Sequence, residues 1–256
     1  MTTTIDALLR GDYHVHSTFS DDAHSTVSEN LAAASSAGLS EIRLVEHVRQ
    51  STTWVPDFLT TVSAAATFTG LTVLTGVEAK ILNARGELDL PPDLVAGPGG
   101  VGAILIADHQ FPGFDGAWTP DETRAKIAAG LSVADVLDLL IGATVAAMES
   151  VEWGQLAHCF SILPKIGLAE GDLTDEHLAA WAAAAASTGT LIEVNEKWGC
   201  PGPRALRAAV AADAQLVAST DSHVATDVGR YSQVSTILTA LDEFSETAQA
   251  IGTGQR

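Results

Sequence analysis

The sequence contains few basic residues. Its 256 residues include 13 Lys and Arg against 32 Asp and Glu, which gives a formal net charge of −19. A surface that binds long nucleic acids or anionic membranes needs clustered basic side chains. The charge balance therefore argues against both of these partners, although it is compatible with nucleotides and other small molecules.

Cysteine and long apolar runs are also scarce. Two cysteines are too few for a disulfide framework, and we expect Cys159 to be a buried thiol and Cys200 a loop thiol. The first ten residues contain no basic region and no long apolar stretch, so no signal peptide or membrane span is expected. These absences favour a cytoplasmic location, whereas the oligomeric state is left open.

Stretches typical of strands and helices alternate along the chain, which favours a parallel β/α architecture. A hairpin is expected at 80–90, irregular chain at 91–102 and a loop at 111–118. No repeat or boundary interrupts the pattern, so the sequence predicts one domain over residues 1–256. The expected strands are 12–16, 41–47, 71–79, 101–109, 155–159, 190–195 and 216–221; the expected helices are 28–37 with Ser28 as N-cap, 56–69, 132–151, and four that begin near 119, 174, 203 and 232.

Histidines and acids recur where these strands end. Because His14 and His16 are two residues apart on a strand, their side chains share one face. Parallel strands of a barrel end at the same mouth, and imidazole and carboxylate groups gathered in one place are typical metal ligands. The pattern predicts a multinuclear metal site, with His24 and His177 outside it. The residues in the pattern are His14, His16, His47, Glu78, His109, His158, Asp221 and His223.

Together these motifs resemble the PHP (polymerase and histidinol phosphatase) family, over nearly the whole chain from Tyr13 to Arg230. The resemblance implies a distorted seven-stranded (β/α)7 TIM-like barrel that holds two or three divalent metal ions. The matching segments are 12–22, 45–47, 76–79, the strand that ends at His109, 157–158, 192–195 and 219–223. The implied metal ligands are His14, His16, Asp22, His47, Glu78, His109, His158, Asp221 and His223. Asp22 is preferred to the adjacent Asp21 because residues 25–28 then align without a gap.

The activity that the resemblance implies is hydrolysis of a small phosphate monoester, and histidinol phosphate is the family's best-known substrate. Imidazoles and carboxylates suit Zn²⁺, Mn²⁺ and Fe²⁺. Glu78 is expected to bridge two metals, and a metal-bridging hydroxide is expected to attack phosphorus. Asp221 and His223 are the expected catalytic residues, and either His223 or a third metal assists departure of the leaving alkoxide.

Basic side chains near strand ends are candidates for binding the substrate phosphate. Arg230 and Lys197 are the first choices, because Arg230 lies in the last loop and Lys197 follows a strand end. Aromatic residues in 110–118 either cover the substrate or pack on the barrel rim. Glu46 is expected to point to the opposite face of its strand from the adjacent ligand, with either a structural role or one of supporting a ligand. The remaining candidates are Lys80, Arg124 and Lys165.

Three alternative functions stay open at this point. An amidohydrolase that cleaves C–N or lactone bonds also begins with His-x-His, but Glu78 and the Asp-Ser-His ending fit the PHP pattern better. A bridging modified lysine would favour the amidohydrolase, and Lys80 is not an obvious counterpart of that lysine. A nucleotide phosphodiesterase or exonuclease is compatible with the acidic balance. A PHP-like module kept for structure or partner binding would be expected to have lost ligands, and none is missing from the motifs.

Overall fold

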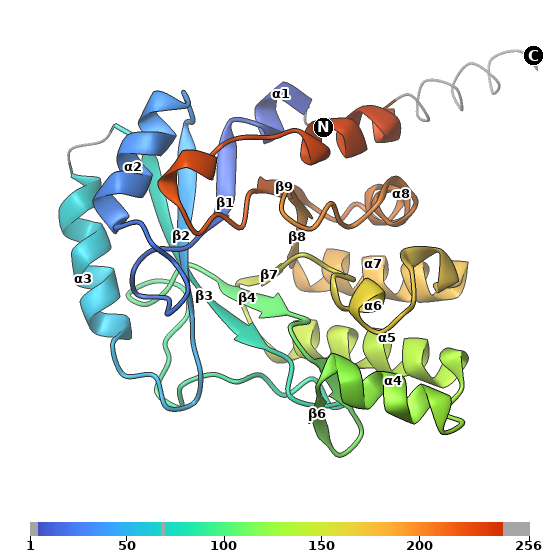
Figure 1. Ribbon diagram of the computed structural model, residues 1–256. Helices are drawn as coiled ribbons and strands as arrows, with labels where there is room; N and C mark the ends of the chain where they lie inside the picture. Colours follow the sequence, from blue (N-terminus) through green and yellow to red (C-terminus); the bar gives the residue numbers. More distant parts are fainter. Residues whose placement is uncertain (1–4, 68–69, 243–256) are drawn as a thin grey trace, which may run out of the picture.

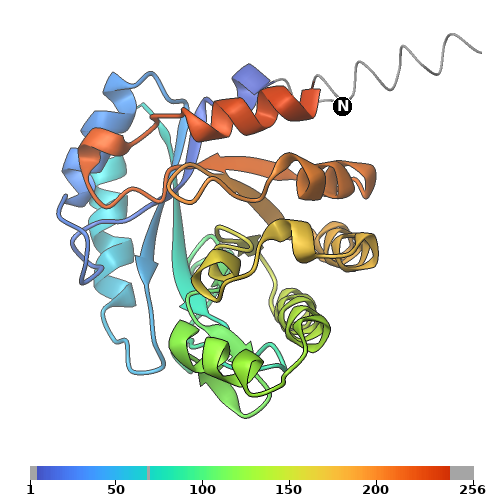
Figure 2. The same ribbon diagram turned by 45° about the vertical axis from the view of Figure 1, so that its right-hand side comes forward.

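Seven parallel strands form a curved sheet that nearly closes into a barrel (Figures 1 and 2). This computed structural model describes residues 5–67 and 70–242. A bridge between Val15 and Ser222 joins the two edges of the sheet, so the predicted distorted seven-stranded (β/α) barrel is confirmed. In spatial order, which is also chain order, the strands are β1 (Gly11–Val15), β2 (Glu41–His47), β3 (Thr72–Lys80), β4 (Ile104–Ala107), β7 (Gly154–Leu156), β8 (Leu191–Asn195) and β9 (Leu216–Ser219).

Helices surround this sheet, with α2 and α3 beside the first three strands and α5, α7 and α8 on the other side (Figure 2). The largest apolar cluster fills the space between the sheet and the second group, where Trp181 is fully buried. Among the described residues, no helix combines the length and apolar character needed to cross a bilayer. The helices are α1 (Ile5–Leu8), α2 (Val27–Ser36), α3 (Val55–Ala66), α4 (Pro120–Ala128), α5 (Val133–Ser150), α6 (Ile162–Lys165), α7 (Asp175–Thr188), α8 (Pro203–Ala211), the short η1 (Glu170–Asp172) and η2 (Ala225–Asp227), and residues 233–242.

The N-terminus of α2 differs from the prediction. Thr26, not Ser28, caps this helix: its side chain accepts a hydrogen bond from the Glu29 amide, and the Glu29 carboxylate accepts one in return from the Thr26 amide. This reciprocal pair satisfies two amides at the helix end that would otherwise lack partners. The expected N-cap at Ser28 is therefore wrong by two residues.

Other boundaries are also corrected by the structure. The strands β4 and β7 end at Ala107 and Leu156, so the histidines that follow them lie in loops. The expected loop at 111–118 forms a hairpin of β5 (Phe111–Gly113) and β6 (Gly116–Trp118). An antiparallel bridge from Ile81 to Leu88 confirms the hairpin expected at 80–90. The helix predicted over 56–69 ends at Ala66, and its last expected residues lie outside the described ranges.

Polar side chains cross the inside of the barrel, where apolar layers are usual. The guanidinium of Arg43 donates to Gln155 Oε1, and Gln155 Nε2 lies 2.6 Å from Glu193 Oε1. Gly76 makes room for this arrangement, since a Cβ there would lie 3.3 Å from Arg43 Cδ and 2.9 Å from Leu105 Cδ1. The result is a buried carboxylate, Glu193, held below the mouth of the barrel.

Candidate metal centre

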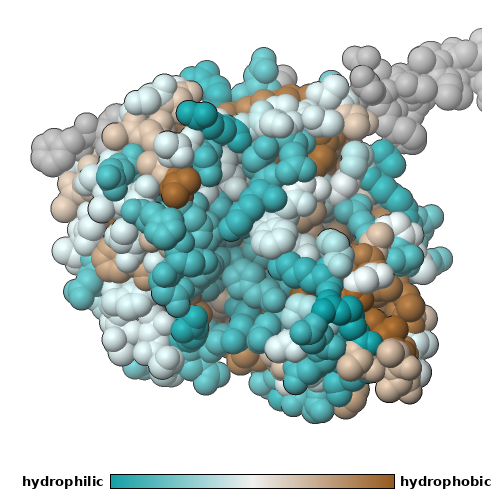
Figure 3. All heavy atoms as spheres, in the orientation of Figure 1, coloured by the Kyte–Doolittle hydropathy of each residue, from teal (hydrophilic) through white to brown (hydrophobic). Residues whose placement is uncertain are grey.

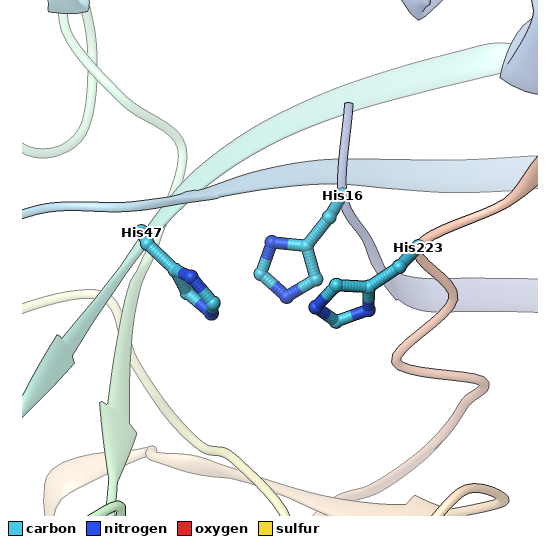
Figure 4. Close-up of side chains that lie close together, drawn as sticks. All are labelled: His16, His47 and His223. Atoms are coloured by element: carbon cyan, nitrogen blue, oxygen red, sulfur yellow. The ribbon is translucent and has the colours of Figure 1, made fainter. Parts of the chain in front are cut away.

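The predicted ligand residues come together where the strands end. His16 follows β1, His47 ends β2 and His223 lies in the loop after β9, and their imidazole rings face one another (Figure 4). The ligand atoms of His16, His47 and His223 all lie within 4.8 Å of one another, as do those of two overlapping groups. Those groups are His14, His16 and Asp221, and His47, Glu78 and His109.

Glu78 lies at the centre of this cluster, and its two oxygens face different histidines. Its Oε2 atom is 2.9 Å from His47 Nε2 and 3.3 Å from His14 Nε2. Its Oε1 atom is 3.1 Å from His109 Nε2 and 3.0 Å from His158 Nε2. One carboxylate thus joins two groups of imidazoles, which is the arrangement expected of a carboxylate that bridges two cations.

The donor set fits divalent metal ions. Glu78 Oε2 is buried and makes no hydrogen bond, although a buried carboxylate oxygen normally has a partner. Ligand atoms that surround one tetrahedral ion at ordinary bond lengths lie about 3.4 Å apart. The separations around this oxygen, 2.9 Å to His47 and 3.5 Å to His16, are close to that value. A cation shared with these imidazoles would satisfy the orphaned oxygen.

The two adjacent aspartates in the loop after β1 have different partners. Asp22 Oδ1 lies 3.4 Å from His47 Nδ1, and Asp22 Oδ2 lies 3.2 Å from His223 Nε2. Asp21 forms an exposed ion pair with Arg49 at 3.3 Å. Both carboxylates come near His47, but of the two, within the described residues, Asp22 alone contacts two histidines of the cluster.

A second layer of polar groups orients the buried imidazoles. His14 Nδ1 is 2.9 Å from Glu193 Oε1, and His158 Nδ1 is 3.3 Å from Asp108 Oδ1. Such contacts fix the tautomer and turn the other ring nitrogen toward the metal. Neither acid was predicted to have a role from the sequence. The position of Glu193 on an inward-facing side of a strand could have indicated a role in the site. The role of Asp108 is recognisable only from its contact with His158.

His16 is held in a similar way, through a hydroxyl. Its Nδ1 atom is 3.2 Å from Ser20 Oγ, and Ser20 Oγ is 2.7 Å from Glu46 Oε2. Glu46 also accepts hydrogen bonds from the amide and hydroxyl of Ser17. Its carboxylate therefore supports the loop that follows β1, in keeping with the structural role expected of it.

Two residues of the cluster have unusual backbone conformations. Among the described residues, five other than glycine have positive φ, and they include His158 at 31° and Asp221 at 51°. Such conformations cost free energy and persist where the surroundings enforce them, often at functional sites. The His158 amide donates to Glu193 Oε2 at 3.2 Å, so the carboxylate below the mouth also secures this turn.

The pKa values of the clustered histidines and of Glu78 are set by two opposing effects, burial and the charges of their neighbours. Burial opposes a charge on His14, but Glu193 and Glu78 outweigh it and raise the pKa of His14 well above its usual value. Burial is likewise outweighed at His158, where Asp108 and Glu78 raise the pKa to about 10. Burial also opposes a charge on Glu78, yet its histidine neighbours hold its pKa well below the usual range. Protons and metal cations would therefore compete for the nitrogens of these imidazoles.

His16 differs from these histidines. Burial lowers the pKa of His16 to about 3, although a hydrogen bond to Asp221 works in the opposite direction. This imidazole is therefore neutral near pH 7, which is the form that binds metals. Asp221 stays ionised, because contacts with His16 and His14 outweigh its burial and lower its pKa.

The candidate phosphate-binding residues occupy different places. Lys197 Nζ is 3.3 Å from His223 Nδ1 and 3.4 Å from Asp221 Oδ2. Arg230 lines a cavity of about 370 Å³ together with Lys197, Asp221 and His223. The structure therefore places both first choices beside the cluster, while Lys80 instead pairs with Asp89 at 3.4 Å.

The other two candidates lie on α4 and α6. Arg124 donates to the carbonyl of Lys165 and pairs with Asp121. Lys165 Nζ lies 4.0 Å from the ring centre of Trp198, whose Nε1 donates to Asp221 Oδ2 at 2.9 Å. Trp198 was not predicted from the sequence to be part of the site, because an isolated tryptophan in a loop does not indicate which residues lie beside it.

The remaining histidines and aromatics lie around this centre. His24 is exposed, as expected, whereas His177 is half-buried and pairs with Asp138. In the β5–β6 hairpin, the rings of Phe111 and Trp118 are buried and stacked with centres 5.5 Å apart, which supports the packing interpretation for these two. Phe114 is 59% exposed. Both cysteines are buried, Cys200 included.

The face of the molecule in Figure 3 is largely hydrophilic, and a hollow lies near its middle. This surface agrees with the excess of acids in the composition. Arg230 and Lys197 lie beside the metal-ligand cluster, although basic residues are scarce in this protein.

The comparison with known families agrees with this geometry. A model of the PHP domain matches residues 12–197, which is most of the chain. The chain therefore belongs to the PHP domain family. The matched range includes the strands from β1 to β8, and β9 adds Asp221 and His223 to the same cluster.

Individual relatives are more distant. A protein of Photobacterium profundum, described as a probable phosphatase, is 38% identical over 87 residues, which are 33% of this chain and 35% of the relative. The chain thus aligns with about a third of that relative's length. A histidinol phosphate phosphatase from Lactococcus lactis, solved with zinc, L-histidinol and phosphate, is 16% identical with a TM-score of 0.63, over 91% of this chain and 92% of the other. This second similarity is one of fold.

A further solved structure, from Bifidobacterium adolescentis and described as a candidate metal-dependent phosphoesterase, is 17% identical. The match covers 90% of this chain and 95% of the other with a TM-score of 0.39, and nothing below depends on it.

Proposed function

We propose that this protein is a metal-dependent phosphoesterase that hydrolyses a small phosphate monoester. The observation that carries the proposal is Glu78, a buried carboxylate with one orphaned oxygen and histidines at both oxygens. Its surroundings fit two cations close together, and paired metals are suited to in-line displacement at phosphorus. Family membership and the phosphatase descriptions of the relatives support the same reaction class.

The proposed ligands are the clustered side chains, and the proposed ions are two or three of Zn²⁺, Mn²⁺ or Fe²⁺. When bound, such ions lower the pKa of water and neutralise charge that develops on phosphoryl oxygens. The chain's own part is to hold them rigidly, since Glu193 and Asp108 orient His14 and His158. The ligand set is His14, His16, Asp22, His47, Glu78, His109, His158, Asp221 and His223.

Asp221 and His223 carry the proposed catalytic roles. Asp221 is buried, stays ionised and contacts His16 at 3.4 Å. His223 lies at the edge of the cluster, with its Nδ1 3.0 Å from the Asp221 carbonyl and its Nε2 directed at Asp22. We assign to His223 the support of the leaving oxygen, either as a proton donor or as a ligand that would hold a third cation there. No protein nucleophile is needed in this scheme.

Lys197 and Arg230 are the proposed contacts of the substrate phosphate. Both line the cavity beside Asp221 and His223. Basic side chains there would place phosphate oxygens against the cluster and offset the repulsion from its carboxylates. The expected ligand is consequently a small phosphorylated molecule, and histidinol phosphate belongs in the substrate panel because the Lactococcus lactis enzyme was solved with L-histidinol and phosphate.

The deciding experiment is a phosphate-release screen. Phosphomonoesters and nucleotides are incubated with metal-free protein to which Mn²⁺, Zn²⁺ or Fe²⁺ has been added separately. Release of phosphate from monoesters and competitive inhibition by inorganic phosphate are expected. If phosphate neither appears as product nor inhibits at millimolar concentration, the proposal is wrong.

Arg230→Ala tests the phosphate contact. The variant should keep its metals but lose kcat/KM by a factor that corresponds to about 1.5–3 kcal/mol, as expected for a hydrogen bond to a charged group. Arg10→Ala is the matched control, because Arg10 is exposed and lies just before β1, at the opposite end of the barrel from the cluster. An equal loss in both variants would remove Arg230 from the site.

The amidohydrolase alternative has less support. Glu78 contacts histidines through both of its oxygens, whereas the nearby Lys80 ammonium is paired with Asp89. Turnover of neutral esters, lactones or amides without inhibition by phosphate would favour that alternative nonetheless.

A further inference from the structure

A partly exposed tryptophan stands at the edge of the metal-ligand cluster. Trp198 is 40% exposed, and its ring centre lies 5.9 Å from that of His158. Its Nε1 atom donates to Asp221 Oδ2 at 2.9 Å. The indole therefore touches the site through one edge and remains open to solvent elsewhere, although large aromatic side chains are usually well buried.

The loop that carries Trp198 is firmly held. The Trp198 amide donates to Asn195 Oδ1 at 3.1 Å, and the Asn195 amide donates to the Cys200 carbonyl at 2.8 Å. Asn195 Nδ2 in turn contacts Glu193 and Ser219 inside the barrel. An exposed ring fixed in this way offers a preorganised surface for a ligand, since little freedom is lost when something stacks on it.

Two ammonium groups flank this ring, and they differ in their partners. Lys197 Nζ, 5.9 Å from the ring centre, contacts the Asp221 carboxylate at 3.4 Å. Lys165 Nζ, 4.0 Å from the ring centre, forms no ion pair with any carboxylate of the described residues. In a chain with 32 acids and 13 basic residues, a half-buried lysine beside the site that forms no ion pair with a described carboxylate can pair with a ligand anion.

From this arrangement we infer that Lys165 and Trp198 form a subsite for the leaving group of the substrate, and that it accepts a planar leaving group with a negative charge. The inference rests on the proposed phosphoesterase function. The ring of Trp198 supplies a stacking surface, and the Lys165 ammonium supplies the counter-charge. The phosphoryl group to be transferred lies beside Lys197 and Arg230, so Lys165 recognises the other end of the molecule.

Three esters with the same ring test the subsite: phenyl phosphate, 4-carboxyphenyl phosphate and 4-(aminomethyl)phenyl phosphate. The wild-type protein should have the highest kcat/KM for the carboxylate and the lowest for the amine. In Lys165→Met, the ratio of kcat/KM for the carboxylate to that for the amine should fall about tenfold, with most of the change in KM. Differences in intrinsic reactivity between the esters cancel, because each ratio is compared between proteins.

Lys126→Met is the matched control. Lys126 Nζ lies 4.3 Å from the ring centre of Trp118, so the substitution removes the same charge from the same kind of pair. Trp118, however, is buried, and its Nε1 donates to Asp115 rather than to the metal-ligand cluster. The carboxylate-to-amine ratio in Lys126→Met should equal that of the wild type.

Trp198→Leu tests the stacking surface independently of charge. Its kcat/KM should fall more for phenyl phosphate than for propyl phosphate, because only the planar group stacks on the ring. The metal content of every variant is measured to show that the cluster is intact. 4-Carboxyphenylphosphonate, which is not hydrolysed, should bind more weakly to Lys165→Met than to the wild-type protein, whereas Lys126→Met should bind it as tightly as the wild type does.

The outcomes separate this inference from the proposed function. If no phosphomonoester or nucleotide of the wider screen releases phosphate with any metal and phosphate does not inhibit, the phosphoesterase proposal fails. If other monoesters are hydrolysed but none of the three aryl esters is, the leaving-group subsite is wrong. If the esters are hydrolysed but Lys165→Met keeps the wild-type ratio, the leaving-group subsite is wrong. An equal loss for all three esters would place Lys165 on the transferred phosphate instead and would also overturn the inference.

Discussion

Two glutamates on neighbouring strands are buried to a similar degree and have opposite surroundings. Glu46 on β2 is 0% exposed, and Glu78 on β3 is 2% exposed. In the register of the two strands, His47 pairs with Glu78 while Glu46 pairs with Val77. Because side chains alternate along a strand, the two carboxylates point to opposite faces of the sheet. One faces the loop after β1, and the other faces the mouth.

Their neighbours determine what each carboxylate can do. Burial raises the pKa of Glu46 to about 7, and the hydroxyls and amide of Ser17 and Ser20 only partly oppose it. Burial has the same tendency at Glu78, but the imidazoles around it lower its pKa well below the usual range. Hydroxyl groups can form hydrogen bonds with either the protonated or the ionised form of a carboxyl group. Imidazoles favour the anion, and they can exchange their protons for metal ions.

Glu78→Gln should give the largest effect in this comparison. The substitution keeps the shape of the side chain and removes the negative charge shared by the two groups of imidazoles. Metal affinity should fall by more than the roughly 10–100-fold that the loss of an outer partner costs, and hydrolysis should be lost with it. Elemental analysis and phosphate release measure the two effects, and circular dichroism checks the fold. Full metal content in this variant would contradict the bridging role.

Glu193→Gln should have the next largest effect, because Glu193 orients His14 without facing the ions. We expect a loss of about 10–100-fold in metal affinity, the usual range for such partners. Glu41→Gln is the matched control: Glu41 begins β2 at the other end of the barrel and accepts a hydrogen bond from Tyr13. Competition titration with a chelator measures the affinities. Similar affinities in the two variants would mean that Glu193 does not tune the site.

Metal binding should release protons, because His14 and His158 have raised pKa values in the metal-free protein. Protonated imidazoles must lose their protons before they bind metal, so affinity should fall as the pH falls below these pKa values. The expected slope is about tenfold per pH unit for each proton displaced. Calorimetry in buffers of different ionisation enthalpy counts the protons. Binding that is independent of both buffer and pH would exclude these histidines as ligands.

Glu46→Gln should give the smallest effect. The side-chain amide of the glutamine can still accept a hydrogen bond from Ser17 and can donate one to Ser20. We therefore expect a loss of about 1 kcal/mol or less in the free energy of unfolding. Metal content and kcat/KM should stay close to those of the wild type. Chemical denaturation and elemental analysis test this prediction. A loss of metal as large as that in Glu78→Gln would abolish the distinction between the two glutamates.

Much of this arrangement was predictable from local patterns. The alternation of strands and helices favoured a parallel β/α architecture, and the resemblance to the PHP family implied the barrel. The histidines at strand ends predicted their gathering at one mouth, because parallel strands all end on the same side. Some boundaries were predicted less well: β4 and β7 stop before His109 and His158, and α2 begins after Thr26. Patterns locate an element better than its ends, since the ends depend on particular hydrogen bonds.

By itself, the sequence determined which chemical groups are present, their order along the strands and the excess of acid that limits possible partners. Only the tertiary structure decided which groups meet. It placed Asp22 between His47 and His223, Glu193 beneath His14, and Trp198 between Asp221 and Lys165. These contacts join residues that are distant along the chain, and their geometry depends on loop conformations. No local sequence pattern predicts these contacts, because the burial and the charge around a side chain depend on which residues the fold places next to it.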